Sequence, residues 1–69
     1  MTLAKVTEVT CESGKSFEDA IANGIKEAGK TVRDIKSAWI AEQKVIVDNN
    51  KIVEYRVTMR ITFVLHRDS

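Results

Sequence analysis

The alternation of apolar and polar residues near the end of the chain constrains the fold most strongly. Apolar side chains occupy every second position from Tyr55 to Leu65, and mostly polar side chains occupy the positions between them. Successive side chains of a β-strand point to opposite faces, so this period of two predicts a strand with one buried face and one polar face. We therefore expect residues 54–66 to lie in a long strand at the edge of a core.

The segment DNNK, residues 48–51, predicts a hairpin that joins this strand to the one before it. Asparagine tolerates the positive φ that a two-residue turn needs, so Asn49 and Asn50 are expected at its centre. The resulting register places on the apolar face the pairs Ile40 with Met59 and Ala38 with Ile61. It places on the other face the pairs Trp39 with Arg60, Ala41 with Thr58 and Gln43 with Arg56. Trp39 is therefore predicted to lie on the sheet face away from the core.

A helix is predicted over Phe17–Ala28. Ser16 suits its N-cap position, and Glu18 and Asp19 lie where the helix dipole favours negative charge. The apolar residues of this segment recur at helical spacing and form one stripe: Phe17, Ala20, Ile21, Gly24, Ile25 and Ala28. This spacing predicts that the helix packs on the sheet, with Gly24 allowing a close approach.

A shorter β-rich run, Leu3–Thr10, precedes the helix and is separated from it by a predicted loop, ESGKS. The element order is then β–α–β–β. We predict an α+β fold in which a three-stranded antiparallel sheet carries one helix on one face, in a single domain spanning residues 1–69. A helix of about 13 residues spans only about 20 Å, so it cannot cover the long strands. The rest of the sheet is expected to face water or neighbouring copies of the chain.

Composition narrows the range of functions. The 69 residues include one cysteine and one histidine, so an internal disulfide and a structural zinc site are excluded. A chain this short buries a limited core, which makes self-association the expected source of extra stability. The net charge is +1 with interspersed signs, which predicts neither nucleic-acid nor membrane binding. With no signal-like or membrane-spanning segment, we expect a cytoplasmic protein with a reduced Cys11.

The face that carries Trp39 is the candidate binding surface. Trp39 either stacks on a planar ligand or fills an interface, and Arg60 beside it can form a cation–π pair. In one interpretation Arg56, with Gln43 beside it, binds a carboxylate, a phosphate or a pair of carbonyl groups of a ligand. In the other, Arg56 and Arg60 form interchain salt bridges with Glu42 or Glu54. We expect structural roles for three other residues: Cys11 and Tyr55 pack in the core, and His66 is a solvated or interface residue. No nucleophile–base pair or paired catalytic carboxylates occur, so we do not expect an enzyme.

The chain resembles the dodecin family over nearly its whole length. The segments that carry the resemblance are AKVTEV, the entry to the helix in ESGKSFEDAI, the exit in KTVRDI, and the final strand EYRVTMRITFVL. The resemblance implies a hollow homododecamer that binds and stores a flavin (riboflavin, FMN or FAD), which limits the photochemistry of the free flavin.

Two positions depart from the flavin-binding pattern of that family. The family's stacking tryptophan corresponds to Ser37 here, two residues before Trp39, and its flavin-contacting glutamine corresponds to Arg56. A subgroup of the family with such replacements is associated with calcium. The expected ligand residues are therefore Ser37, Trp39, Gln43, Arg56 and Arg60, with a structural or calcium-binding dodecamer as the alternative function.

Overall fold

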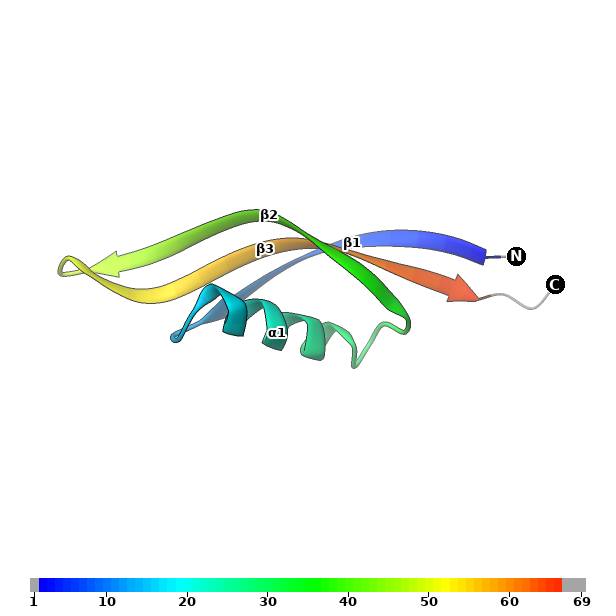
Figure 1. The fold of residues 1–69 in the computed structure, drawn as a ribbon, viewed down its shortest axis with the longest axis horizontal. Coiled ribbons are helices and arrows are strands. Elements are labelled where there is room, and N and C mark those ends of the chain that lie inside the picture. Colours follow the sequence, from blue (N-terminus) through cyan, green and yellow to red (C-terminus); the bar gives the residue numbers. More distant parts are fainter. Residues whose placement is uncertain (1, 67–69) are drawn as a thin grey trace.

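The computed structural model describes residues 2–66, which form the elements β1 (Thr2–Ser13), α1 (Phe17–Ala28), β2 (Ile35–Asp48) and β3 (Lys51–His66). The central strand is β3, and β1 and β2 pair with its two edges in antiparallel orientation. Figure 1 shows α1 lying along one face of this sheet. The predicted α+β fold, with element order β–α–β–β, is confirmed.

The helix has the predicted bounds, and Ser16 is its N-cap. The Ser16 hydroxyl accepts a hydrogen bond from the backbone N–H of Asp19 at 3.0 Å. The C-cap is Gly29, whose N–H donates to the Ile25 carbonyl at 2.9 Å. No helix within residues 2–66 is long and apolar enough to span a membrane.

The first strand is longer than predicted. It continues past Thr10 to Ser13, because Glu12 and Ser13 pair with β3 rather than forming a loop. Ser13 is buried, and its hydroxyl donates to Asp19 Oδ2 at 2.6 Å, which ties the end of β1 to the first turn of α1. Pairing with a distant strand here overrides the local turn preference of serine and glycine.

The core lies between α1 and the middle of β3. Ala20 and three alternating β3 residues, Val57, Met59 and Ile61, are fully buried, and Phe63 is nearly so. Residues from the other elements pack around them: Val9, Cys11, Phe17, Ile21, Ile25, Ala28, Ile35, Ala38 and Ile40. Tyr55 extends this face with an edge-to-face contact on Phe17, at 5.1 Å between ring centroids. The predicted buried face of β3, with Tyr55 as a packing residue, is confirmed.

The hairpin turn is also confirmed. Asn49 and Asn50 both have positive φ, 52° and 61°, as a two-residue turn requires. The predicted pairs Ile40–Met59, Trp39–Arg60 and Ala38–Ile61 are present, and Asp48 pairs with Lys51 beside the turn.

The predicted register is wrong between residues 41 and 46. A register shift after Ile40 leaves Ala41 without a ladder partner, and a second shift between Ile46 and Val47 restores the original register. Gln43 therefore pairs with Val57 and faces the helix side, while Lys44 takes the place opposite Arg56. The shift has the form of a β-bulge, in which one extra residue turns the following side chains to the other face.

The helix covers only the middle of the sheet. The Cα atoms extend over 57 × 19 × 13 Å, whereas a 12-residue helix is about 18 Å long. In Figure 1 the β2–β3 hairpin projects beyond one end of α1, and the ends of β1 and β3 project beyond the other. Several apolar side chains on these projections are about half exposed: Leu3, Val6, Val47, Ile52 and Val53.

Gly24 stands where α1 comes closest to the sheet. A Cβ atom at this position would lie 2.8 Å from Cys11 Sγ, 2.9 Å from Met59 Cε and 3.0 Å from Cys11 Cβ. The Met59 methyl can move aside, but Cys11 Cβ is attached to the strand backbone. We expect Gly24→Ala to lower the free energy of unfolding by about 1 kcal/mol, because overpacking of about 1–3 kcal/mol exceeds the gain of about 1 kcal/mol in helix propensity.

Urea unfolding followed by circular dichroism measures this difference. Gly29→Ala is the matched control, because its Cβ would come no closer than 3.3 Å to any atom outside its immediate neighbours. If Gly24→Ala proves as stable as Gly29→Ala, the helix does not approach the sheet as closely as described.

Candidate functional site

The sheet face opposite α1, called here the open face, carries three rows of side chains that run across the strands. Each row takes one residue from β1, one from β3 and one from β2. The rows are Glu8–Arg60–Trp39, Thr10–Thr58–Glu42 and Glu12–Arg56–Lys44. Since every second residue of a strand faces the same side, the buried alternation of β3 forces its arginines and threonines onto this face.

Trp39 lies in the first row and is 62% exposed. The Arg60 guanidinium carbon lies 4.7 Å from the centroid of the Trp39 ring, and Arg60 Nε lies 3.3 Å from Glu8 Oε2. The predicted cation–π pair is present, and Glu8 holds the guanidinium from the other side. Such exposed contacts contribute about 0.5–1 kcal/mol each, so they orient Arg60 more than they stabilise the fold.

Arg56 lies in the third row and is held by two carboxylates of its own chain. Its Nε is in contact with Glu54 Oε2 and lies 3.4 Å from Glu12 Oε2. Glu54, suggested by the sequence as an acidic partner, therefore pairs with Arg56 within one chain. Two carboxylates therefore surround the single positive charge of Arg56.

A hollow of about 390 Å³ lies between the Trp39 row and the next row. It is lined by Glu8, Thr10, Trp39, Ala41, Glu42, Thr58 and Arg60. Ser37 is exposed and pairs with Thr62, two residues before Trp39 on β2, so it lies beside Trp39 on the side away from this hollow. The structure thus brings Ser37, Trp39 and Arg60 together, places Arg56 farther along β3, and moves Gln43 to the opposite face.

Sequence reasoning missed three members of this face: Glu8, Glu12 and Lys44. The two glutamates become neighbours of the arginines only through the pairing of β1 with β3, which links residues some fifty positions apart. The place of Lys44 depends on the register shift at Ala41. A predicted register for the pairing of the first and third strands would have placed Glu8 opposite Arg60 and Glu12 opposite Arg56. The opposite charges of these pairs would have supported it.

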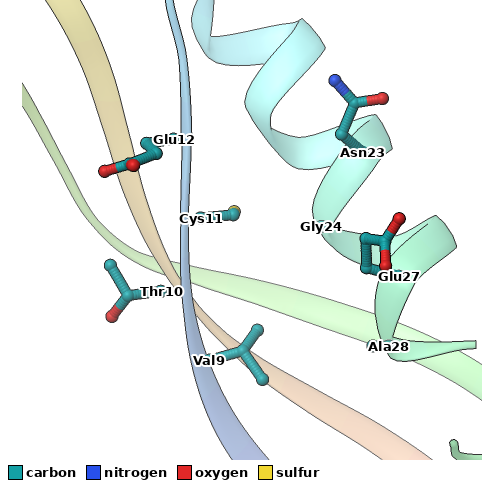
Figure 2. Close-up of a pocket in the computed structure, with 8 residues that line it drawn as sticks. All are labelled: Val9, Thr10, Cys11, Glu12, Asn23, Gly24, Glu27 and Ala28. Atoms are coloured by element: carbon teal, nitrogen blue, oxygen red, sulfur yellow. The ribbon is translucent and has the colours of Figure 1, made fainter.

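A second hollow, shown in Figure 2, lies between β1 and α1 and contains Cys11. The Cys11 thiol lies 3.5 Å from the Val57 carbonyl, to which it donates, and it packs against the core. Burial raises the pKa of the Cys11 thiol above its ordinary value of 9.0. A raised pKa keeps the thiol protonated and unreactive, in line with the predicted packing role.

The raised pKa of Cys11 has a consequence for stability. Above pH 9.0 the thiol ionises in the unfolded chain before it ionises in the folded one. The stabilisation due to this group is therefore complete below that pH and is lost as the pH rises through the folded pKa. We expect the melting temperature to fall more steeply as the pH rises above 9.0 in the wild type than in Cys11→Ala. Equal slopes in the two proteins, followed by circular dichroism, would contradict the burial of the thiol.

The described residues hold no ready-made metal centre. Within residues 2–66, no group of three or more histidine, cysteine, aspartate or glutamate side chains is close enough to bind one ion. Glu8 and Glu12 face arginines on the open face instead.

Comparison with known proteins identifies the family. Residues 3–66 match the family model described as Dodecin. The calcium dodecin of Mycobacterium tuberculosis is 32% identical over 63 residues, which cover 91% of this chain and 89% of that protein.

Solved structures agree with this match. The dodecin from Streptomyces davaonensis has a TM-score of 0.91 at 26% identity, over 96% of this chain and 97% of that one. A crystal structure of the calcium dodecin from M. tuberculosis has a TM-score of 0.81 at 28% identity, over 97% and 96%. The family match over most of the sequence and the shared fold together show that this chain belongs to the dodecin family.

Proposed function

We propose that this protein binds a flavin (riboflavin, FMN or FAD) on its open face and stores it without turnover, as a cytoplasmic homododecamer. The observation that carries the proposal is the exposure of Trp39. A large aromatic ring that is 62% exposed on a sheet face, with an arginine beside it, is suited to stacking on a planar ligand.

In this proposal the side chains around Trp39 have the following roles. Trp39 stacks on the isoalloxazine ring, and Ser37, two positions earlier on the same face, leaves room for it. When the ligand binds, the Arg60 guanidinium exchanges its contact with the Trp39 ring for a contact with the polar groups of the ligand. Its ion pair with Glu8 keeps it near the site. Arg56 donates to the carbonyl or phosphate groups, and Lys44 replaces Gln43 as its neighbour.

Self-association fits the shape of the subunit. The sheet projects beyond the helix at both ends and exposes apolar side chains there, and the open face has no covering layer in the described residues. In a symmetric assembly, two open faces that meet at an axis would enclose a ligand between two tryptophans. Light scattering during size exclusion measures the assembly, for which the proposal expects twelve subunits.

A fluorescence titration tests flavin binding. Riboflavin or FMN is held at low concentration while protein is added, and stacking on Trp39 is expected to quench the flavin emission, with saturation near one flavin per subunit. Parallel titrations with riboflavin and FMN show whether Arg56 and Lys44 recognise the phosphate. If the flavin emission is unchanged at micromolar protein, the protein does not bind flavin and the proposal is wrong.

Calcium is the second candidate ligand. Two observations favour it: the similarity to the calcium dodecin of M. tuberculosis, and the glutamates Glu8, Glu12, Glu42 and Glu54 near one face of the sheet. Carboxylate oxygens are the ligands that calcium prefers, and copies of this face around an axis would supply enough of them.

The two candidates are separated by melting temperature. If calcium is the ligand, millimolar calcium raises the melting temperature relative to EDTA, magnesium at the same ionic strength has a smaller effect, and riboflavin has none. If flavin is the ligand, riboflavin raises the melting temperature and calcium does so no more than magnesium.

A further inference from the structure

The hollow of about 390 Å³ beside Trp39 has two carboxylates in its lining. Glu8 lies on β1 and Glu42 on β2, the strands that flank the central strand β3. Among the described residues that line the hollow, Arg60 is the only one with a cationic side chain. The lining therefore carries more negative than positive charge at neutral pH.

The two carboxylates differ in what they contact. Glu8 Oε2 lies 3.3 Å from Arg60 Nε, and the same guanidinium lies over the Trp39 ring. Within residues 2–66, the Glu42 side chain has no hydrogen-bond or ion-pair partner. An ionised carboxylate only accepts hydrogen bonds, and its two oxygens together can accept about four. Glu42 is therefore available to accept hydrogen bonds from a molecule in the hollow.

Two hydroxyl groups of the lining add to this preference for hydrogen-bond donors. Thr10 and Thr58 pair across β1 and β3, and their Oγ1 atoms lie 3.4 Å apart. A hydroxyl group can donate or accept, so each can bind a hydroxyl group of a ligand. The guanidinium of Arg60 is already held by Glu8. The hollow as a whole suits a ligand group that is rich in hydroxyl or N–H donors and carries no negative charge.

The neighbouring row of the open face offers no excess of positive charge either. Arg56 is in contact with Glu54 and lies 3.4 Å from Glu12 Oε2, and Lys44 pairs with Arg56 from β2. Two cations thus stand beside two carboxylates. A phosphate monoester carries a charge of about −1.5 to −2 at neutral pH, and neither the hollow nor this row balances it.

We propose that the hollow binds the hydroxylated side chain of an uncharged flavin, and that the Glu42 carboxylate makes the site select riboflavin over FMN. The proposal rests on the flavin binding proposed above and narrows its ligand. Because Trp39 itself lines the hollow, a ring stacked on the indole places its substituents there. The hydroxyl groups of riboflavin then donate to Glu42, whereas the phosphate of FMN meets a carboxylate.

The size of the preference follows from the spacing of the charges. Positions two apart on a strand are about 7 Å from each other, which is also the scale of the separation between Glu42 and a group in the hollow. Repulsion of a phosphate over this distance in an exposed site weakens binding by about fivefold at low ionic strength. The screening length falls from about 30 Å at 0.01 M salt to about 8 Å at 0.15 M, so added salt reduces the preference.

Fluorescence titrations of riboflavin and of FMN with the full-length protein test the proposal, each at about 0.01 M and about 0.15 M salt. Glu42→Gln keeps the shape of the side chain and an acceptor oxygen but removes the charge. Glu18→Gln removes the same charge from an exposed position in the first turn of α1, on the other side of the sheet, and is the matched control. Far-UV circular dichroism confirms that each variant is folded.

We expect wild-type protein at low salt to bind riboflavin about fivefold more tightly than FMN, with a smaller ratio at high salt. In Glu42→Gln the Kd for riboflavin should rise, because a charge-assisted hydrogen bond is lost, while the Kd for FMN should fall. Opposite changes for the two flavins cannot arise from a general loss of structure, which would weaken both. Glu18→Gln should keep the wild-type ratio.

Two results would overturn the role of Glu42 and leave flavin binding intact: equal Kd values for the two flavins in the wild type, or an unchanged ratio in Glu42→Gln. If neither riboflavin nor FMN is quenched by the wild type, the proposed function is wrong and the selectivity is wrong with it.

Discussion

Replacement of Trp39 by alanine is expected to remove most of the flavin quenching at protein concentrations that just saturate the wild type. The indole is 62% exposed and would lose its contact with the ligand entirely. Loss of an aromatic stacking partner corresponds to about 2 kcal/mol, which is a roughly thirtyfold rise in Kd. The titration described for the wild type measures this change directly.

The matched control is Trp39→Phe, which keeps an aromatic ring and should retain most of the binding. Molar mass is measured on the same samples. The alanine variant is expected to keep the wild-type value, because in the proposed function the ring contacts the ligand and not a neighbouring subunit. Dissociation of Trp39→Ala into smaller species would contradict this role and would make Trp39 a part of the subunit interface.

Replacement of Met59 by alanine is expected to destabilise the fold by about 2–5 kcal/mol. Met59 is fully buried at the centre of β3, and its Cε lies next to Gly24 of α1. Truncation leaves a cavity at the closest approach of helix and sheet. Since a domain of this size has a total stability of about 3–10 kcal/mol, Met59→Ala should remove a large fraction of it.

A pair of valine substitutions controls for the loss of apolar side chains in general. Val57 is fully buried beside Met59, whereas Val6 is 57% exposed. Denaturant unfolding should show that Val57→Ala is clearly less stable than the wild type and that Val6→Ala differs by less than about 0.5 kcal/mol. If the two valine variants were equally stable, the core would not lie where the structure places it.

Much of the fold could be predicted because its patterns are strong and local. The alternation in β3 identified the buried face, Ser16 and Gly29 marked the ends of α1, and the two asparagines fixed the turn. Together they also fixed the position of Trp39 opposite Arg60. These elements are specified by burial, which penalises any alternative register.

The placement of Gln43 could not be predicted because burial does not specify the register in this part of β2. Glu42, Gln43 and Lys44 are three consecutive polar residues, and Val45, Ile46 and Val47 are three consecutive apolar ones, so a shift by one residue changes little in burial. This part of β2 also lies toward the hairpin end, where α1 does not cover the sheet. No buried face constrains the register there, and the bulge is free to form.

The ion pairs of the open face were missed because they depend on long-range pairing. Glu8 meets Arg60, and Glu12 meets Arg56, only once β1 and β3 are aligned. Nothing in the local sequence around either glutamate marks it as a partner of a particular arginine.

A crystal structure of the protein with riboflavin would test the central claim most directly. The account predicts electron density for the isoalloxazine ring parallel to the Trp39 indole at a stacking distance of about 3.5 Å, with Arg56 in contact with its polar groups. An unliganded Trp39 packed against a neighbouring subunit, with riboflavin bound elsewhere or not at all, would contradict it.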